Sequence, residues 1–207
     1  NGPPFITTAA GDTVIAAGTF THTNGVINGT WEVQGNLIIG AGADDQFGSS
    51  DVGSGTITFT GTANQTYTYS AGGITAHLRV NKSSGTVTPA SGTTELSVNA
   101  FTLTAGSFTA PTGTLTVGRK SASETIFTVA SGTTFTHNSG TVTFDPVSNC
   151  GAQTFTVDVA TSLTLNNITI NGQDGCNGPP FITTAAGDTV IAAGTFTHTD
   201  GILNGTW

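Results

Sequence analysis

The two cysteines carry the most specific chemistry in the sequence. Cys150 and Cys176 lie 26 positions apart, and the chain has no others. If the chain winds in coils of about that length, the two residues fall on neighbouring coils, about 4.8 Å apart and within reach of a disulfide. The alternative is two reduced side chains buried in the core. We expect the disulfide, which needs an oxidising compartment, and peptide mapping without reductant tests it.

Acidic side chains gather in only one stretch, between positions 40 and 55. Asp44, Asp45 and Asp51 lie there among glycines and serines, and carboxylate oxygens are ligands that Ca²⁺ prefers. Their spacing matches neither an EF-hand nor a nonapeptide calcium repeat. We therefore favour a solvated loop, keep calcium as a weak candidate, and expect no cofactor and no other metal.

The four histidines are the remaining candidates for catalysis. His22 and His198 occupy equivalent repeat positions, and His77 and His137 lie in similar Thr-rich stretches. Carbohydrate-cleaving β-helix enzymes need paired carboxylates, whereas the acidic residues outside positions 40–55 are scattered. We expect all four histidines to be outward-facing strand residues, and we predict that the protein is not an enzyme.

The charge of the chain excludes several kinds of partner. Its net charge is −8 and only four residues are basic. Nucleic acids and anionic membranes both attract basic side chains, so neither is an expected partner. No apolar run approaches the roughly 20 residues of a spanning helix, so no membrane insertion of this segment is expected.

The beginning of the sequence returns near its end. Residues 1–31 and 177–207 match at all but three positions, with an offset of 176. The three exceptions in the first copy are Asn24, Val26 and Ile27. A fixed period is typical of tandem repeats. We interpret 1–176 as one unit of two diverged half-units of about 88 residues, 177–207 as the start of the next unit, and the chain as an excerpt from a longer array.

Short alternating patterns indicate strands and no helix. Thr alternates with Val, Leu, Ile or Phe, which places apolar side chains on one face and hydroxyls on the other. Gly, Ser, Asn and Asp separate these stretches, as turns require. The clearest stretches are 56–60, 66–68, 102–104, 114–116, 134–136, 141–143 and 154–156. The fold class is therefore predicted to be all-β.

Two all-β architectures fit these patterns: a parallel β-solenoid with coils of roughly 20–30 residues, and tandem β-sandwich domains of about 88–100 residues. We favour the solenoid because the strands are short and the half-units differ in loop length. The residues expected to form its stacked inner ladders are Phe20, Phe59, Leu103, Leu115, Phe135, Val142, Phe144 and Phe155. Trp31 would also suit a sandwich core, and we expect it and its equivalent Trp207 to pack rather than to bind sugars.

Residues 78–118, 139–146 and 163–171 also carry a family resemblance. Their Thr/Gly-rich pattern resembles the tandem repeats of giant bacterial cell-surface proteins, which are similar to β-solenoid adhesin stalks. The resemblance implies an extracellular stalk-like or fibrous protein and carries no catalytic residues to this chain.

The function predicted from these features is structural. We expect a segment of an extracellular bacterial filament or cell-surface stalk, whose partners are adjacent repeats or copies of itself stacked end to end. The alternative is an adhesin module that binds surface glycans through the 40–55 loop or another protruding corner. Remote alternatives are a polysaccharide-active β-helix enzyme and an ice-binding protein. Ice binding is disfavoured because the Thr-x-Thr stretches recur at irregular gaps and are expected on several faces.

Overall fold

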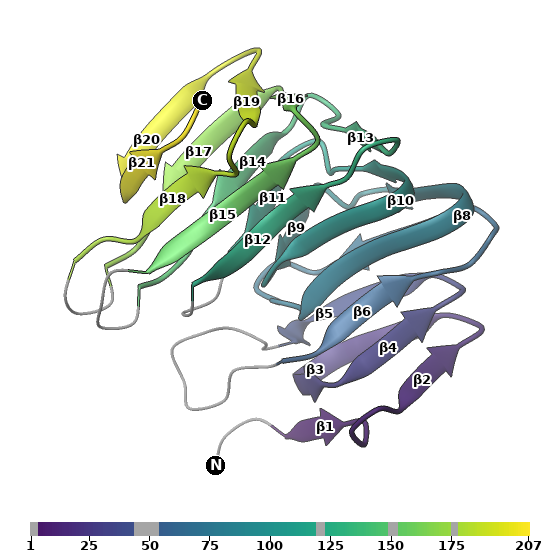
Figure 1. Cartoon of the computed structure of the whole chain (residues 1–207). Coiled ribbons are helices and arrows are strands. Elements are labelled where there is room, and N and C mark those ends of the chain that lie inside the picture. Colours follow the sequence, from purple (N-terminus) through teal and green to yellow (C-terminus); the bar gives the residue numbers. More distant parts are fainter. Residues whose placement is uncertain (1–3, 44–53, 119–122, 149–152, 175–177) are drawn as a thin grey trace.

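The described part of the chain is all-β and contains no helix. The computed structural model describes residues 4–43, 54–118, 123–148, 153–174 and 178–207. Its strands stack from the N-terminal end to the C-terminal end, so the two termini lie at opposite ends of the stack (Figure 1). Every stretch that the Thr alternation singled out forms a strand, which confirms the all-β prediction.

Most of the described strands belong to one long sheet. Its members are β1 (Phe5–Thr7), β2 (Thr13–Ala16), β3 (Phe20–Asn28), β4 (Thr30–Val33), β5 (Leu37–Ala43), β6 (Thr56–Phe59), β7 (Gln65–Tyr69), β8 (His77–Pro89), β10 (Phe101–Thr109), β12 (Glu124–Val129), β13 (Thr134–Thr136), β15 (Thr154–Val159), β18 (Phe181–Thr184) and β21 (Ile202–Asn204). The long strands β8 and β10 each pair along one edge with two different strands. β8 pairs first with β6 and further on with β7, and β10 pairs first with β12 and further on with β13.

Two smaller sheets complete the described fold. The second sheet consists of β9 (Glu95–Val98), β11 (Thr114–Val117), β14 (Thr141–Phe144), β17 (Asn167–Asn171) and β20 (Phe196–Asp200). The third sheet pairs β16 (Ser162–Leu165) with β19 (Thr189–Ala192).

All of the strand pairings among the described residues are parallel. The partner of a strand lies a variable distance along the chain: Thr13 pairs with Thr30, 17 positions later, and Glu124 with Phe155, 31 positions later. Most spacings fall in the expected range of roughly 20–30 residues, such as 23 for Leu78 with Phe101, and the first two pairs lie just outside it. Turns of different length join strands that still stack in register. Parallel pairing is consistent with a solenoid, whereas tandem sandwiches would require antiparallel sheets.

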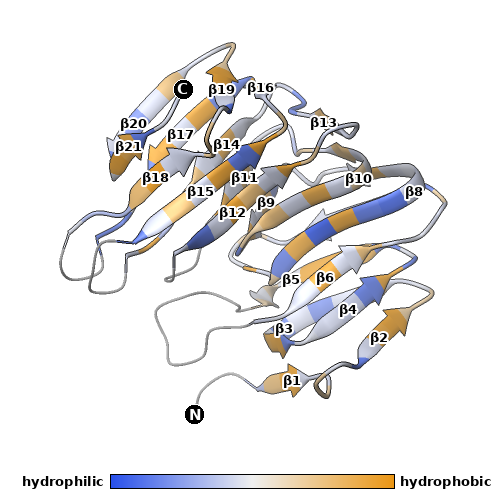
Figure 2. Ribbon diagram, viewed as in Figure 1, coloured by the Kyte–Doolittle hydropathy of each residue, from blue (hydrophilic) through white to orange (hydrophobic). Residues whose placement is uncertain are grey.

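The core consists of ladders of apolar side chains. Ile57 pairs with Leu78, Leu78 with Phe101, and Phe101 with Phe127, and all four are fully buried. The ring centroids of Phe101 and Phe127 are 5.5 Å apart. Figure 2 shows the corresponding alternation of hydrophobic and hydrophilic residues along β8 and β10. Because each fully buried side chain of this size contributes roughly 1.5–3 kcal/mol, these ladders hold successive strands together.

The residues predicted to face inward do so. Six of the eight are buried, and Phe20 and Phe135 are half-buried and pack against the core. Trp31 and Trp207 also pack against it, as expected: the Trp31 and Phe20 ring centroids are 5.3 Å apart. The Nε1–H of Trp31 donates a hydrogen bond to the carbonyl oxygen of Asn28 at 2.9 Å.

The two copies of the repeated segment share local contacts, although their strands belong to different sheets in part. The backbone N–H of Thr30 donates to Oγ1 of Thr8 at 3.1 Å, and the equivalent N–H of Thr206 donates to Oγ1 of Thr184 at 2.9 Å. The turn before Thr30 needs a glycine, because Gly29 has a φ of +81° and a Cβ there would run into the Thr8 side chain. The same short sequence thus specifies the same local structure at both ends of the chain.

Candidate functional site

Sites of metal or disulfide chemistry are not seen in the described part of the chain. Within it, no three His, Cys, Asp or Glu side chains gather where they could hold a metal ion. Asp44, Asp45 and Asp51 lie outside the described residues, as do Cys150 and Cys176, so the calcium site and the disulfide stay predictions. The described residues also include no helix long and apolar enough to span a membrane.

The prediction that His22 faces outward is wrong. Its side chain is only 3% exposed, and its Nε2 lies 2.8 Å from the carbonyl oxygen of Gly25. The side chain is covered because β3 pairs with β5, where Ile39 is the register partner of His22. Burial lowers the pKa of His22, which favours the neutral imidazole. The equivalent His198 lies near the C-terminal end of the chain and is exposed.

The other two histidines are half-buried rather than fully outward-facing. The Nε2 of His77 lies 2.8 Å from Oγ1 of Thr102 on the neighbouring strand. The Nδ1 of His137 accepts a hydrogen bond from the backbone N–H of Ser139 at 3.1 Å. Both contacts orient the rings within their own turn or sheet.

A buried lysine is the polar feature that sequence reasoning missed. Lys82 is 1% exposed, and its Nζ donates to the carbonyl oxygens of Gly61 and Ala63 and to Oε1 of Gln65. The Nε2 of Gln65 donates in turn to the carbonyl oxygen of Val33 at 2.9 Å. Burial lowers the pKa of Lys82. The network ties the turn between β6 and β7 to neighbouring coils, which is a structural role.

The one sequence signal for the burial of Lys82 is its position in the alternation of inward and outward side chains along the strand. Val80 faces the core, and Lys82 lies two positions further along the same strand, so period-two alternation places it inside. The residue type argued against this signal, because lysine is rarely buried.

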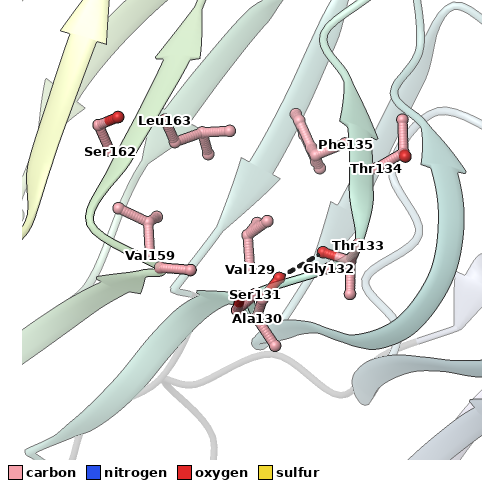
Figure 3. Close-up of a pocket in the computed structure, with 11 residues that line it drawn as sticks. Val129, Ala130, Ser131, Gly132, Thr133, Thr134, Phe135, Val159, Ser162 and Leu163 are labelled. Atoms are coloured by element: carbon pink, nitrogen blue, oxygen red, sulfur yellow. Dashed lines mark hydrogen bonds between the residues drawn. The ribbon is translucent and has the colours of Figure 1, made fainter.

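A hollow of about 340 Å³ lies where two rows of strands separate (Figure 3). β13 pairs with β10, and β16 pairs with β19, but β13 and β16 are not partners of each other. The hollow is lined by residues 129–135 and by Val159, Ala160, Ser162 and Leu163. Its side chains are apolar or hydroxylic, and the Thr133 hydroxyl donates to the carbonyl oxygen of Ala130 at 2.7 Å. The lining therefore offers no acid, base or cation for catalysis.

An exposed apolar edge lies at the N-terminal end of the stack. We call this edge, formed by Phe5, Ile6 and Val14 on β1 and β2, the leading edge, and its side chains are 48%, 53% and 42% exposed. Hydrophobic stretches are visible on β1 and β2 in Figure 2. β1 and β2 are each paired on one side only, with β3 and β4, and an edge strand with apolar side chains is a template for pairing with another strand.

The second copy of the repeat shows what covers such an edge. Ile182 and Val190, the equivalents of Ile6 and Val14, are both 0% exposed. Ile182 pairs with Phe155 on β15, and Val190 with Leu163 on β16. β20 likewise pairs with β17. We call the surface formed by β15, β16 and β17 the seat.

On their C-terminal side the first copy is buried and the second copy is more exposed. Val26 and Ile27 in the first copy are 1% exposed, because further coils follow them. In the second copy Ile202, the equivalent of Val26, is 39% exposed, and Leu203, the equivalent of Ile27, is half-buried. The first copy is therefore covered by the coils that follow it, and the second copy by the coils that precede it.

Comparisons with protein-family models, with curated proteins and with solved structures find no match. The resemblance to repeats of giant bacterial cell-surface proteins therefore stays a prediction.

Proposed function

We propose that the chain is a segment of a parallel β-solenoid made of tandem 176-residue units, which serves as a stalk or filament outside a bacterial cell. The observation that carries the proposal is the match between the leading edge and the seat. The second copy lies on the seat in register, where Ile182 and Val190 are buried and Phe181, the equivalent of Phe5, is half-buried.

The energetics favour such stacking. About half of each leading-edge side chain is in contact with water, so covering it contributes roughly 1 kcal/mol or more per residue, in addition to the new backbone hydrogen bonds. In a solenoid each coil contacts only its neighbours, so the stack can be lengthened one unit at a time without changing the units already present.

Composition supports a location outside the cell. Only 8% of the residues are charged and only four are Lys or Arg, so the chain offers few cleavage sites to trypsin-like proteases. A disulfide between Cys150 and Cys176, if formed, would need the same oxidising environment. We therefore place the proposed stalk at the cell surface or in secreted material, with adjacent repeats as its partners.

The experiment compares this chain with a chain lengthened by one further 176-residue unit. Seven successive pairings lead from β2 to β18, through β4, β6, β8, β10, β12 and β15. These pairings lead from Val14 to Thr184, 170 positions along the chain, so a unit of 176 residues corresponds to slightly more than seven steps. At about 4.8 Å a step, one added unit should lengthen the particle by about 35 Å in small-angle X-ray scattering.

Tandem sandwiches make a different prediction. Two domains per unit would add about 80 Å, with beads visible by electron microscopy. An increment of that size, or a longer chain that stays compact, would contradict the solenoid stalk.

A further inference from the structure

The second sheet carries a regular array of outward-facing hydroxyl groups. Thr116 on β11 pairs with Thr143 on β14, and Thr143 with Thr169 on β17. β20 extends this row with Thr197. A second row runs beside it, because Thr114 pairs with Thr141 and Thr141 with Asn167. We define the hydroxyl face as Thr114, Thr116, Thr141, Thr143, Asn167, Thr169 and Thr197.

The array is more regular than the sequence indicates. Thr114 and Thr141 are 27 positions apart, Thr141 and Asn167 are 26, and Thr169 and Thr197 are 28. The pairings from β9 through β11 and β14 to β17 nevertheless show no register shift, whereas those of β10 with β8 and of β12 with β15 do. The expectation that irregular gaps scatter the threonines is thus wrong for this sheet, because turns absorb the differences.

The array has two fixed spacings. Neighbouring strands place equivalent hydroxyls about 4.8 Å apart, and positions i and i+2 of one strand lie about 6.6 Å apart. Thr is β-branched and therefore stiff at χ1, so its hydroxyl and methyl groups are held in a limited set of directions. Hexagonal ice repeats its oxygen atoms in two perpendicular directions at distances close to these two spacings.

The chemistry of the face argues against other ligands. It contains no aromatic ring on which a sugar could stack, and no charged side chain that would bind a phosphate or a mineral ion. The nearest charge in the register belongs to Glu95 on the edge strand β9. An uncharged surface of hydroxyl and methyl groups repeated in register best matches an ordered lattice of water molecules.

We propose that the hydroxyl face binds ice. The outer row of the long sheet provides the contrast within the same molecule. In that row Glu32 pairs with Thr58 and Thr58 with Arg79, and further along Thr128 pairs with Asp158. Strongly hydrated charges interrupt that row, so ice binding should be confined to the second sheet.

The test measures thermal hysteresis and the inhibition of ice recrystallisation by the purified chain. Thr143→Tyr places a bulky ring at the centre of the hydroxyl face and should remove most of the hysteresis. The matched control is Thr128→Tyr, on a half-exposed residue of the charged row, which should leave the hysteresis unchanged. Circular dichroism and a melting curve establish that each variant is folded, and Thr116→Tyr replaces the first variant if that one does not fold.

Three results would overturn the proposal. The folded parent chain could show neither hysteresis nor inhibition, the Thr143→Tyr and Thr128→Tyr variants could lose activity equally, or the labelled chain could bind crystalline cellulose or chitin and not ice. These outcomes are distinguishable from failure of the stalk proposal, because the hysteresis of one chain does not depend on stacking of further units.

Discussion

The repeated segment allows one isoleucine to be tested in two environments. Ile182 is 0% exposed and lies on the seat, whereas its equivalent Ile6 is 53% exposed at the leading edge. Truncating a buried isoleucine to alanine costs about 2–5 kcal/mol, because transfer free energy is lost and a cavity remains. At Ile6 only about half of the side chain leaves water on folding, and no closed cavity forms, so Ile6→Ala should cost about 1 kcal/mol or less.

Tryptophan fluorescence can read the two ends separately. Trp31 and Trp207 are the only tryptophans in the chain, and the ring centroid of Trp207 lies 5.7 Å from that of Phe144. In a Trp31→Phe background, the emission of Trp207 follows the C-terminal coil during urea unfolding. Terminal coils of a stacked protein can open before the rest, so this local signal is the appropriate one.

Ile182→Ala should shift the Trp207 transition to clearly lower urea. Ile6→Ala, followed through Trp31 in a Trp207→Phe background, should shift its own transition much less. Val190→Ala and Val14→Ala form a second matched pair, 0% and 42% exposed. Equal shifts within both pairs would refute the reasoning, since they would mean that the seat does not bury the second copy in solution.

Three further predictions concern single residues. His22 has a lowered pKa in the folded chain, so its contribution to stability should be complete above the unfolded value of about 6.5 and be lost as the pH falls through the folded pKa; His22→Gln should flatten this part of a stability–pH profile. Lys82→Met removes the donor to three acceptors and should destabilise by about 1–3 kcal/mol in urea unfolding, whereas an unchanged midpoint would contradict the structural role. Gly29→Ala should destabilise by more than about 1 kcal/mol, and clearly more than Gly11→Ala, because both glycines have positive φ but only Gly29 has a neighbour in the way; equal melting temperatures for the two variants would count against this account.

Period-two alternation was sufficient to predict seven of the described strands and part of the core. Thr114–Val117 and Thr141–Phe144 are strands with Leu115, Val142 and Phe144 inside, because a side chain that alternates with Thr has only two faces to choose from. The same parity rule placed Phe155 in the core. These features depend on local sequence alone, which is why they could be read without the structure.

Burial by a neighbouring coil could not be predicted in the same way. His22 and His198 have nearly the same local sequence and the same hydrogen bond to a glycine carbonyl oxygen, yet one is buried and the other exposed. The difference depends on whether a further strand follows: β5 pairs with β3, whereas β20 is the edge strand of its sheet among the described residues. The register that aligns Thr116 with Thr143 was hidden for a different reason, because it depends on turn lengths that vary between coils.

The stalk proposal and the ice-binding proposal both involve β20. This strand closes the second sheet, and Phe196 to Thr199 repeat the sequence of Phe20 to Thr23 at the start of β3. β3 pairs with β5, β5 with β7, and β7 with β8, where Thr66 is the partner of Thr88. If units stack as proposed, the second sheet of one unit therefore continues into β3, β5, β7 and β8 of the next unit. The row of hydroxyl groups is interrupted there at Ile38 of β5 and then continues. Ice affinity should then increase with the number of units, so the lengthened chain should give more hysteresis per molecule than the single one. A lengthened chain with the expected added length but no gain in hysteresis would uphold the stack and contradict the continuity of the hydroxyl rows.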